Sequence, residues 1–352
     1  MKPDYKFTLI HAIDTDNEKV IERTEENPGV HEFIDGLMTE VFDNKNYKRF
    51  KVKEYNTYVI KQITDYIQAE SIPDDSHDDI ATRYLEAEII GREAAERLGQ
   101  KVKMGYLFQA LLSKDSHYYY ILSKIETTSF LSEIDFTKIN GMPFADKALK
   151  SCLIKFDEDK LLEDIYILDK NDSKYWHRDF LDLQEYTTDE LSTKDFYAMI
   201  KKKIIAKARK TPTDLVELTT HLNSYFSQPR KFTLDDMMEN VFNNYSPYNP
   251  TLFDVEKLKN SIVSAAIEKK LNTSFQIVPG EIRKSFNTKL KINQFVKLEI
   301  DMENSDYKNK VGVVYIHSKK YLAIQIDDPD TFESFNNNIL RLDDKDDNKT
   351  NT

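Results

Sequence analysis

The sequence predicts an α+β protein built around an antiparallel β-meander. Four apolar runs, rich in β-branched and aromatic residues, lie between residues 102 and 183 with short polar segments between them. This is the pattern of consecutive antiparallel strands. Residues 114–116 and 157–160 are expected to turn two of the strand pairs. No helical periodicity separates the paired runs, so a meander fits better than strand–helix–strand units.

Strands and helices are predicted before the meander. Residues 5–13 alternate as a strand does, and residues 20–23 are expected to pair with them across a turn. Ser76 and Asp79 form a partial capping box for a long helix, and Gly99 is its expected stop residue. Apolar side chains at helical spacing predict two further helices, over residues 31–42 and 58–68.

Helices and further strands are predicted after the meander. Helical patterns cover residues 192–209, 212–226 and 254–271, and Thr233 is the expected N-cap of another helix. From residue 275 the pattern becomes β-rich. The segment 281–289 is expected to form a short helix between β structures, before a strand over residues 295–300.

The length of 352 residues favours more than one hydrophobic core. We expect four parts: an acidic α+β domain over residues 1–190, a basic helical connector over 191–230, a smaller α+β domain over 231–342 and a disordered acidic tail over 343–352.

Composition excludes several classes of protein. Cys152 is the single cysteine, so no internal disulfide forms, and its apolar surroundings favour a buried thiol. No apolar run reaches 18 residues and no apolar N-terminal segment is present, so a soluble cytoplasmic protein is expected. The seven histidines are scattered, and we expect neither a metal nor a cofactor.

Charge is distributed unevenly along the chain. The formal net charge is −11, but residues 1–190 carry 25 basic and 39 acidic side chains, whereas residues 191–320 carry 22 basic and 14 acidic ones. The basic part therefore has a net charge of +8 within an acidic protein. Such asymmetry indicates an acidic partner for the basic part.

Two groups of basic residues are candidates for contact with phosphates. The first lies on the helix predicted over residues 192–209 and just after it, and the second lies at residues 283–291. A solvated helix face and a charge-balanced surface turn are the alternative interpretations. The candidate nucleic-acid-binding residues are Lys201, Lys202, Lys203, Lys207, Arg209, Lys210, Arg283, Lys284, Lys289 and Lys291.

Catalytic patterns receive little support. Glu158 and Lys160 match the Glu-x-Lys of metal-dependent nucleases, but they fall in a predicted turn, where their side chains would not converge on an ion. His177 has no recognisable nucleophile partner. No phosphate-binding glycine loop and no His-Glu-x-x-His motif occurs. We therefore expect a protein that is not an enzyme.

Short strings across most of the chain resemble the bacterial 37-kDa nucleoid-associated protein family. They lie at residues 9–13, 33–37, 105, 118–125, 173–176, 179–181, 274–277, 281–284 and in the closing strands up to residue 326. The resemblance implies a non-enzymatic, DNA-binding protein of the bacterial nucleoid, and it points to a topoisomerase as a protein partner. Together with the basic region, it predicts binding to double-stranded DNA with low sequence specificity. It supplies no functional residues, so the candidate residues rest on charge.

Two function classes stay open. The leading hypothesis is phosphate contact with DNA through residues 195–300. The alternative is a protein-interaction module whose acidic residues 1–190 engage a DNA enzyme, such as a topoisomerase or a phage-defence partner. Phage defence enters because a composition poor in Gly and rich in Lys, Asn and Ile indicates an AT-rich genome, and genes of this kind travel on mobile elements. Self-association into a homo-oligomer also stays open.

Overall fold

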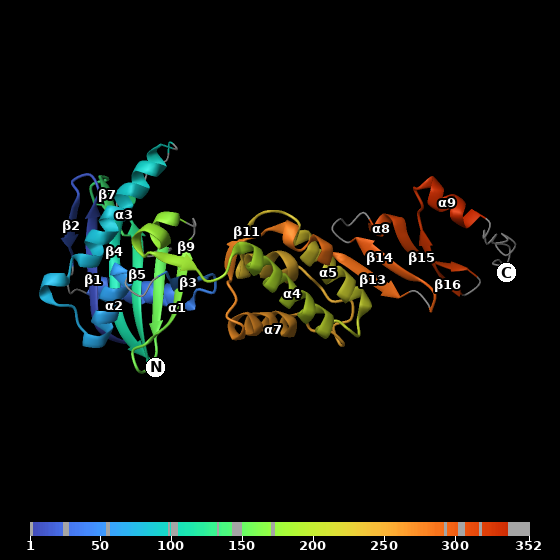
Figure 1. Cartoon of the computed structure of the whole chain (residues 1–352), viewed down its shortest axis with the longest axis horizontal. Coiled ribbons are helices and arrows are strands. Elements are labelled where there is room, and N and C mark those ends of the chain that lie inside the picture. Colours follow the sequence, from blue (N-terminus) through green and yellow to red (C-terminus); the bar gives the residue numbers. More distant parts are fainter. Residues whose placement is uncertain are drawn as a thin grey trace.

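The computed structural model describes residues 3–23, 28–53, 57–97, 99, 105–131, 134–142, 150–169, 173–291, 294–301, 307–316 and 319–336. The fold is α+β, as the sequence predicts. Three parts follow one another along the long axis of the molecule (Figure 1). We call them the sheet body (residues 3–185), the helical body (189–286) and the C-terminal hairpins (287–336).

The sheet body is built on an antiparallel sheet that has eight strands in the described part of the chain, in the order β10-β3-β9-β8-β5-β4-β1-β2. In chain order these are β1 Asp4–Asp14, β2 Lys19–Glu22, β3 Lys48–Val52, β4 Gly105–Lys114, β5 His117–Glu126, β8 Lys150–Phe156, β9 Leu162–Asp169 and β10 Leu183–Glu185. The predicted meander is its centre, because β4, β5, β8 and β9 are consecutive neighbours.

Turn chemistry explains the register of the meander. Asp115 and Ser116 join β4 to β5 with φ angles of 49° and 62°, the left-handed conformation that two-residue hairpin loops need. In the turn 157–160, the carboxylate of Asp157 accepts hydrogen bonds from the backbone N–H groups of Asp159 (3.0 Å) and Leu161 (2.8 Å). A further hairpin, β6 Thr128–Leu131 with β7 Lys138–Gly141, lies between β5 and β8.

Helices cover both faces of the sheet. Helix α1, Pro28–Asp43, packs on one face against residues of β1, β4 and β5. Helices α2, Tyr58–Ala69, and α3, Asp79–Glu96, pack on the other with the π-helical turn η2, Tyr175–Phe180, which buries Trp176 completely. Gly99 has a φ of +72°, and its N–H donates to Glu96 O at 2.9 Å, so it is the helix stop that the sequence predicts.

The helical body has a hydrophobic core of its own. It contains α4 Asp189–Lys207, α5 Pro212–Phe226, β11 Lys231–Thr233, α6 Leu234–Met238, η3 Glu239–Asn243, α7 Val255–Glu268, β12 Ser274–Gln276, η4 Pro279–Glu281 and η5 Arg283–Ser285. One buried cluster runs from Phe196 to Phe286. It joins the predicted connector 191–230 to the first half of the predicted domain 231–342, so the packing is continuous across residue 230.

The C-terminal hairpins are two separate antiparallel pairs. They consist of β13 Asn287–Lys291 with β14 Lys297–Asp301, and β15 Val311–Ile316 with β16 Lys319–Ile324, together with α8 Tyr307–Lys310 and α9 Pro329–Asn336. The predicted acidic tail 343–352 lies outside the described residues.

Three local expectations were wrong. Ser76 does not cap α3: it ends the 3₁₀ turn η1, Asp74–Ser76, and α3 begins only at Asp79. The segment 281–289 is no single helix, because two 3₁₀ turns are followed by a strand from Asn287. The helix predicted to reach Arg209 ends at Lys207. By contrast, Thr233 caps α6 as predicted, its side chain accepting from Asp236 N at 3.2 Å.

Candidate nucleic-acid interface

The first group of candidate cations lies on the second half of α4 and in the turn that follows it. Lys202 and Lys207 are exposed on the helix, and Lys203 is half-buried. Arg209 and Lys210 are exposed in the turn before α5. Helix α4 therefore ends in a concentration of positive charge, with Arg209 and Lys210 beyond its last residue.

Lys201 differs from its neighbours because its side chain makes contacts with other parts of the fold. Its Nζ donates to the backbone oxygen of Ser285 and lies 5.6 Å from the centre of the Tyr197 ring. Burial lowers the pKa of Lys201 below its ordinary value. Lys201, which is half-buried, thus connects α4 to the turn η5.

The contact of Lys201 brings the two predicted basic groups together. The Tyr197 hydroxyl also donates to Ser285 O, at 3.1 Å, so two side chains of α4 hold η5 against the helix. Arg283 and Lys284 of η5 are exposed. Lys289 and Lys291 lie on β13, and their side chains are outside the described part of the structure.

Most of these cations have no partner within the described structure. The side chains without an ion pair or a hydrogen bond to another described residue are those of Lys202, Lys203, Lys207, Arg209, Lys210 and Lys284. We call these six residues the α4 basic surface. An unpaired exposed cation keeps its full capacity to contact a phosphate.

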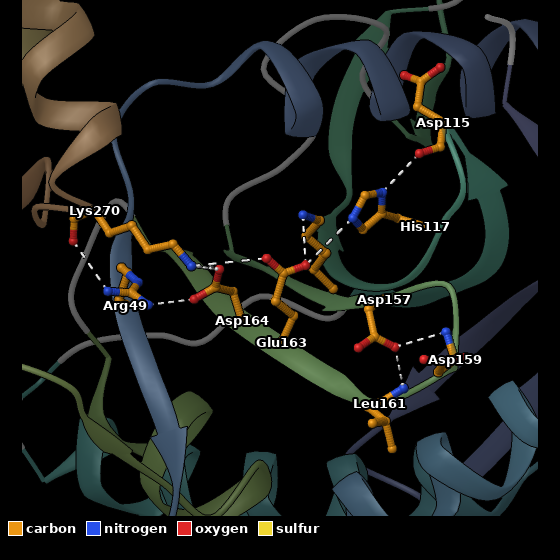
Figure 2. A network of polar contacts seen from close by, with 10 residues as sticks. Arg49, Asp115, His117, Asp157, Asp159, Leu161, Glu163, Asp164 and Lys270 are labelled. Carbon is orange, nitrogen blue, oxygen red and sulfur yellow. Dashed lines mark hydrogen bonds and ion pairs between the residues drawn. The ribbon is translucent and has the colours of Figure 1, made fainter.

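A polar clamp joins the sheet body to the helical body (Figure 2). The Asp164 carboxylate on β9 accepts from Arg49 of β3 and, at 2.8 Å, from Lys270, which follows α7. Arg49 also donates to Lys270 O at 3.3 Å. Burial opposes ionisation of Asp164, but the hydrogen bonds from Lys270 and Arg49 outweigh it and hold its pKa below the ordinary value.

Backbone contacts extend this clamp. The N–H groups of Thr273 and Ser274 both donate to Tyr47 O, at 2.9 and 3.1 Å, and Arg49 N donates to the side chain of Asn272 at 2.8 Å. Asn272 in turn donates to Ser192 of α4 at 3.2 Å. These bonds fix α4, and hence the α4 basic surface, relative to the sheet body.

A polar cavity of about 620 Å³ lies beside the clamp. Its lining includes Arg49, Asp164, Tyr186, Asp195, Lys270 and Asn272. Arg49 stacks over Tyr186 at 4.4 Å from the ring centre. Arg49, Asp164 and Lys270 bind one another. These side chains of the cavity wall therefore serve to join the sheet body to the helical body.

The nuclease-like pair does not converge in the structure. Glu158 is exposed in the turn between β8 and β9. Lys160 forms an ion pair with Glu70 of the sheet body at 2.9 Å, and hydrogen bonds from Lys160, Tyr118 and Lys6 lower the pKa of Glu70 to about 2. Lys160 therefore has a structural partner in a different element.

The other residues that the sequence singled out lie in the core or beside it. Cys152 is completely buried, and burial raises the pKa of its thiol, which makes the reactive thiolate scarce. The ring of His177 lies 4.8 Å from that of Phe50, beside the buried Trp176. These placements agree with packing roles.

Two buried ion pairs were not anticipated from the sequence. Lys124 of β5 binds Glu88 of α3, and both side chains are 2% exposed. Lys150 of β8 lies 3.7 Å from Asp169 of β9, and burial lowers the pKa of Lys150. Lys124 and Lys150 lie on strands of the buried sheet centre, and Asp169 is the cross-strand partner of Lys150, whereas Glu88 comes from a helix that strand periodicity does not identify.

One group of side chains in the described structure has the composition and proximity of a metal site. His11, Glu22 and Asp78 bring a ring nitrogen and two carboxylate oxygens within 4.8 Å of one another. The expectation of no metal rested on the scatter of histidines along the chain, and the fold gathers residues that are far apart in sequence.

Comparison with known proteins gives no identification, because no family model and no curated protein matches the chain. The resemblance to the bacterial 37-kDa nucleoid-associated proteins therefore stays a prediction. Among the described residues, no helix is both long and apolar enough to cross a membrane.

Proposed function

We propose that the protein binds double-stranded DNA through the α4 basic surface, mainly by contacts to phosphates. The observation that carries the proposal is the set of six cations without partners in the described structure, contributed by α4, the following turn and η5. Lysine and arginine side chains that neutralise phosphates supply most of the sequence-independent affinity of DNA-binding proteins. A place on the bacterial nucleoid and a role that is not enzymatic belong to the same proposal.

The position of the α4 basic surface within the fold suits DNA binding. Net acidity repels DNA at long range, so a binding surface must be displaced from the acidic sheet body. Helix α4 lies in the helical body (Figure 1), which the clamp of Arg49, Asp164 and Lys270 joins to the sheet body. The clamp holds the two bodies in a fixed relation, so the basic surface keeps its position.

Binding of a fluorescent duplex at two salt concentrations tests the proposal. Removing one lysine that neutralises a phosphate should reduce the slope of log affinity against log salt by about 0.9. A triple variant, Lys202→Gln with Lys207→Gln and Lys210→Gln, is therefore expected to bind more weakly and to show a slope smaller by about 2.7.

The matched control is Lys19→Gln with Lys51→Gln and Lys61→Gln. These three lysines are also exposed, their side chains have no ion pair or hydrogen bond to another described residue, and they lie in the sheet body. Both triple variants change net charge equally. Equal reductions of affinity in the two, or no binding of the unmodified protein at low salt, would contradict the proposal.

Protein interaction is the second candidate, and the C-terminal hairpins favour it. Strand β15 exposes apolar side chains on both faces, with Val313 59%, Val314 41% and Tyr315 69% exposed. The pair β15–β16 is a separate two-stranded sheet in the described structure, and such a pair is marginally stable alone. Open edges pair readily with another strand, so we propose a second copy of this chain as the partner.

Light scattering of the full chain tests this second candidate. The unmodified protein is expected to be a dimer or larger, and Tyr315→Lys is expected to shift it toward the monomer. Lys319→Gln changes an exposed polar residue of the same pair and serves as the control. A monomeric unmodified protein at high concentration would rule out self-association at this surface.

A further inference from the structure

An edge of the sheet body contains a histidine and two carboxylates that have no place in the proposed DNA contact. Strands β1 and β2 form an antiparallel pair in which His11 lies directly opposite Glu22. Asp78 lies immediately before α3, and its Oδ1 is 3.0 Å from His11 Nε2. The hairpin and the start of a helix thus bring these three side chains to one point.

The environment of His11 is unusual for a ring nitrogen. His11 is completely buried, and its Nε2 atom lies 3.0 Å from Asp78 Oδ1 without a hydrogen bond to it or to another described residue. Buried polar atoms without a hydrogen bond are uncommon in native folds. A cation between Nε2 and the carboxylates would satisfy this nitrogen.

The opposite side of the group is open to solvent. The side chains of Asp78 and Glu22 are 60% and 39% exposed, so an ion can reach the group without a change in the fold. His77 is adjacent, with its Nδ1 3.5 Å from Glu22 Oε2. It adds a second imidazole within reach of the same point.

Buried groups behind His11 can support a ligand role if the Gln109 side-chain amide is reversed. In the structure Gln109 Nε2 lies 3.4 Å from His11 Nδ1, and Gln109 Oε1 accepts a hydrogen bond from the Tyr120 hydroxyl at 2.9 Å. With its amide reversed, Gln109 would accept from Nδ1–H and donate to Tyr120. That arrangement leaves the lone pair of His11 on Nε2, as metal-binding histidines with a supporting hydrogen bond require.

We propose that His11, Glu22 and Asp78 bind a divalent transition-metal ion, with His77 as the neighbouring fourth ligand. Imidazole with carboxylates suits zinc and similar ions better than magnesium or calcium, which prefer oxygen ligands alone. Tetrahedral coordination at about 2.0–2.1 Å places ligand atoms roughly 3.3–3.5 Å apart. The ligand atoms of His11, Glu22 and Asp78, 3.0 Å apart for one pair and within 4.8 Å for all three, need only small side-chain movements, whereas His77 lies outside this group and must move further to join it.

Titration of the metal-free full chain with zinc chloride, followed by calorimetry, tests the site. The unmodified protein is expected to bind one ion at this site. Glu22→Gln and Asp78→Asn each remove the charge of one ligand near the surface, and each is expected to weaken binding at least about 10-fold, the lower range found for substitutions around metal sites. Asp74→Asn is the control, because Asp74 is an exposed carboxylate in η1, a few residues before Asp78.

Absence of zinc binding, or equal weakening in Asp74→Asn, would overturn the proposal. Unchanged affinity in both Glu22→Gln and Asp78→Asn would do the same. Because His11 is buried, His11→Gln risks unfolding, so its fold is first checked by circular dichroism. Cobalt then replaces zinc, and its visible absorption is expected to change between the unmodified protein and His77→Gln, which alters a half-exposed side chain only.

Discussion

Lysines of the sheet body and lysines of α4 are used in opposite ways. Lys48, Lys124 and Lys150 are buried, and each lies against one or more carboxylates. Lys202 and Lys207 are exposed and have no side-chain partner among the described residues. The first group holds strands and helices together, whereas the second is available to a ligand.

The number of charged side chains in a region and the number that a ligand can contact are therefore different properties. The sheet body lies within the acidic part of the chain, and it neutralises part of its acidity internally through buried pairs and the clamp of Arg49, Asp164 and Lys270. The positive charges of the α4 basic surface are not neutralised by other described side chains. Substitution of a buried, paired lysine of the sheet body should therefore have a large effect on stability, and substitution of an exposed lysine of α4 a small one.

The largest effect is expected for Lys124→Met, which leaves Glu88 as an unpaired buried carboxylate. Breaking a buried ion pair costs about 3–5 kcal/mol of unfolding free energy. Trp176, the single tryptophan, is buried in the sheet body and reports its unfolding in urea by fluorescence. The double variant Lys124→Met with Glu88→Leu is expected to recover most of this stability. A cost below about 1 kcal/mol in the single variant would contradict the structural role of the pair.

A smaller effect is expected at the clamp. Asp164→Asn replaces the charged hydrogen bonds from Arg49 and Lys270 with weaker bonds to a neutral amide, which should cost about 1–1.5 kcal/mol for each bond. Because its pKa is held below the ordinary value of 3.8, ionised Asp164 stabilises the fold above that value, and the contribution is lost as pH falls through the lowered pKa.

Unfolding of the two proteins in urea at a series of pH values checks this expectation. The stability difference between the unmodified protein and Asp164→Asn should shrink in strong acid. Glu163→Gln, on the same strand but about one-third exposed, is the control and should cost less. A difference that stays constant down to acidic pH would argue against Asp164 as the ionised centre of the clamp.

A weaker effect is expected for the surface pair of Lys194 and Glu281. Their charged atoms are 2.5 Å apart, but Lys194 is half-exposed, so water and salt screen the attraction. Lys194→Gln is expected to cost about 0–1 kcal/mol. Circular dichroism follows unfolding of the helical body, and the small cost should diminish at high salt. A cost as large as that of Lys124→Met would contradict the expectation that an exposed ion pair contributes less to stability than a buried one.

The smallest effect on stability is expected at the α4 basic surface itself. Each of Lys202→Gln, Lys207→Gln and Lys210→Gln should change the unfolding free energy by no more than about 0.5 kcal/mol, as surface substitutions usually do. The same substitutions should weaken DNA binding. Thermal unfolding and duplex binding measured on one preparation check both expectations, and destabilisation without weaker binding would assign these lysines to the fold.

Local patterns predicted many of the elements. The alternation and turns of the meander, the Gly99 stop and the Thr233 cap are all local signals, and each appears in the structure. The errors also have local causes. Ser76 has the right spacing to Asp79 for a capping box, but it is the last residue of a 3₁₀ turn, and the lysine run continues past the end of α4.

Part of the candidate metal site could have been predicted from the sequence. A hairpin turning between Asp14 and Lys19 places His11 opposite Glu22 by counting the register, so this pair was predictable in principle. Asp78 was not, because its position depends on how α3 packs against the first strands. The same holds for Lys124 and Glu88, whose elements meet only in the folded chain.

By itself the sequence determined the α+β class, the antiparallel order of the meander and the positions of the basic residues, because each depends on neighbours along the chain. Only the tertiary structure decided which cations are available. Lys201 belongs to the same run as Lys202, yet Ser285, far along the chain, binds the first and leaves the second exposed. Hydrogen bonding and burial between distant segments set the availability of a charge, and residue spacing does not encode it.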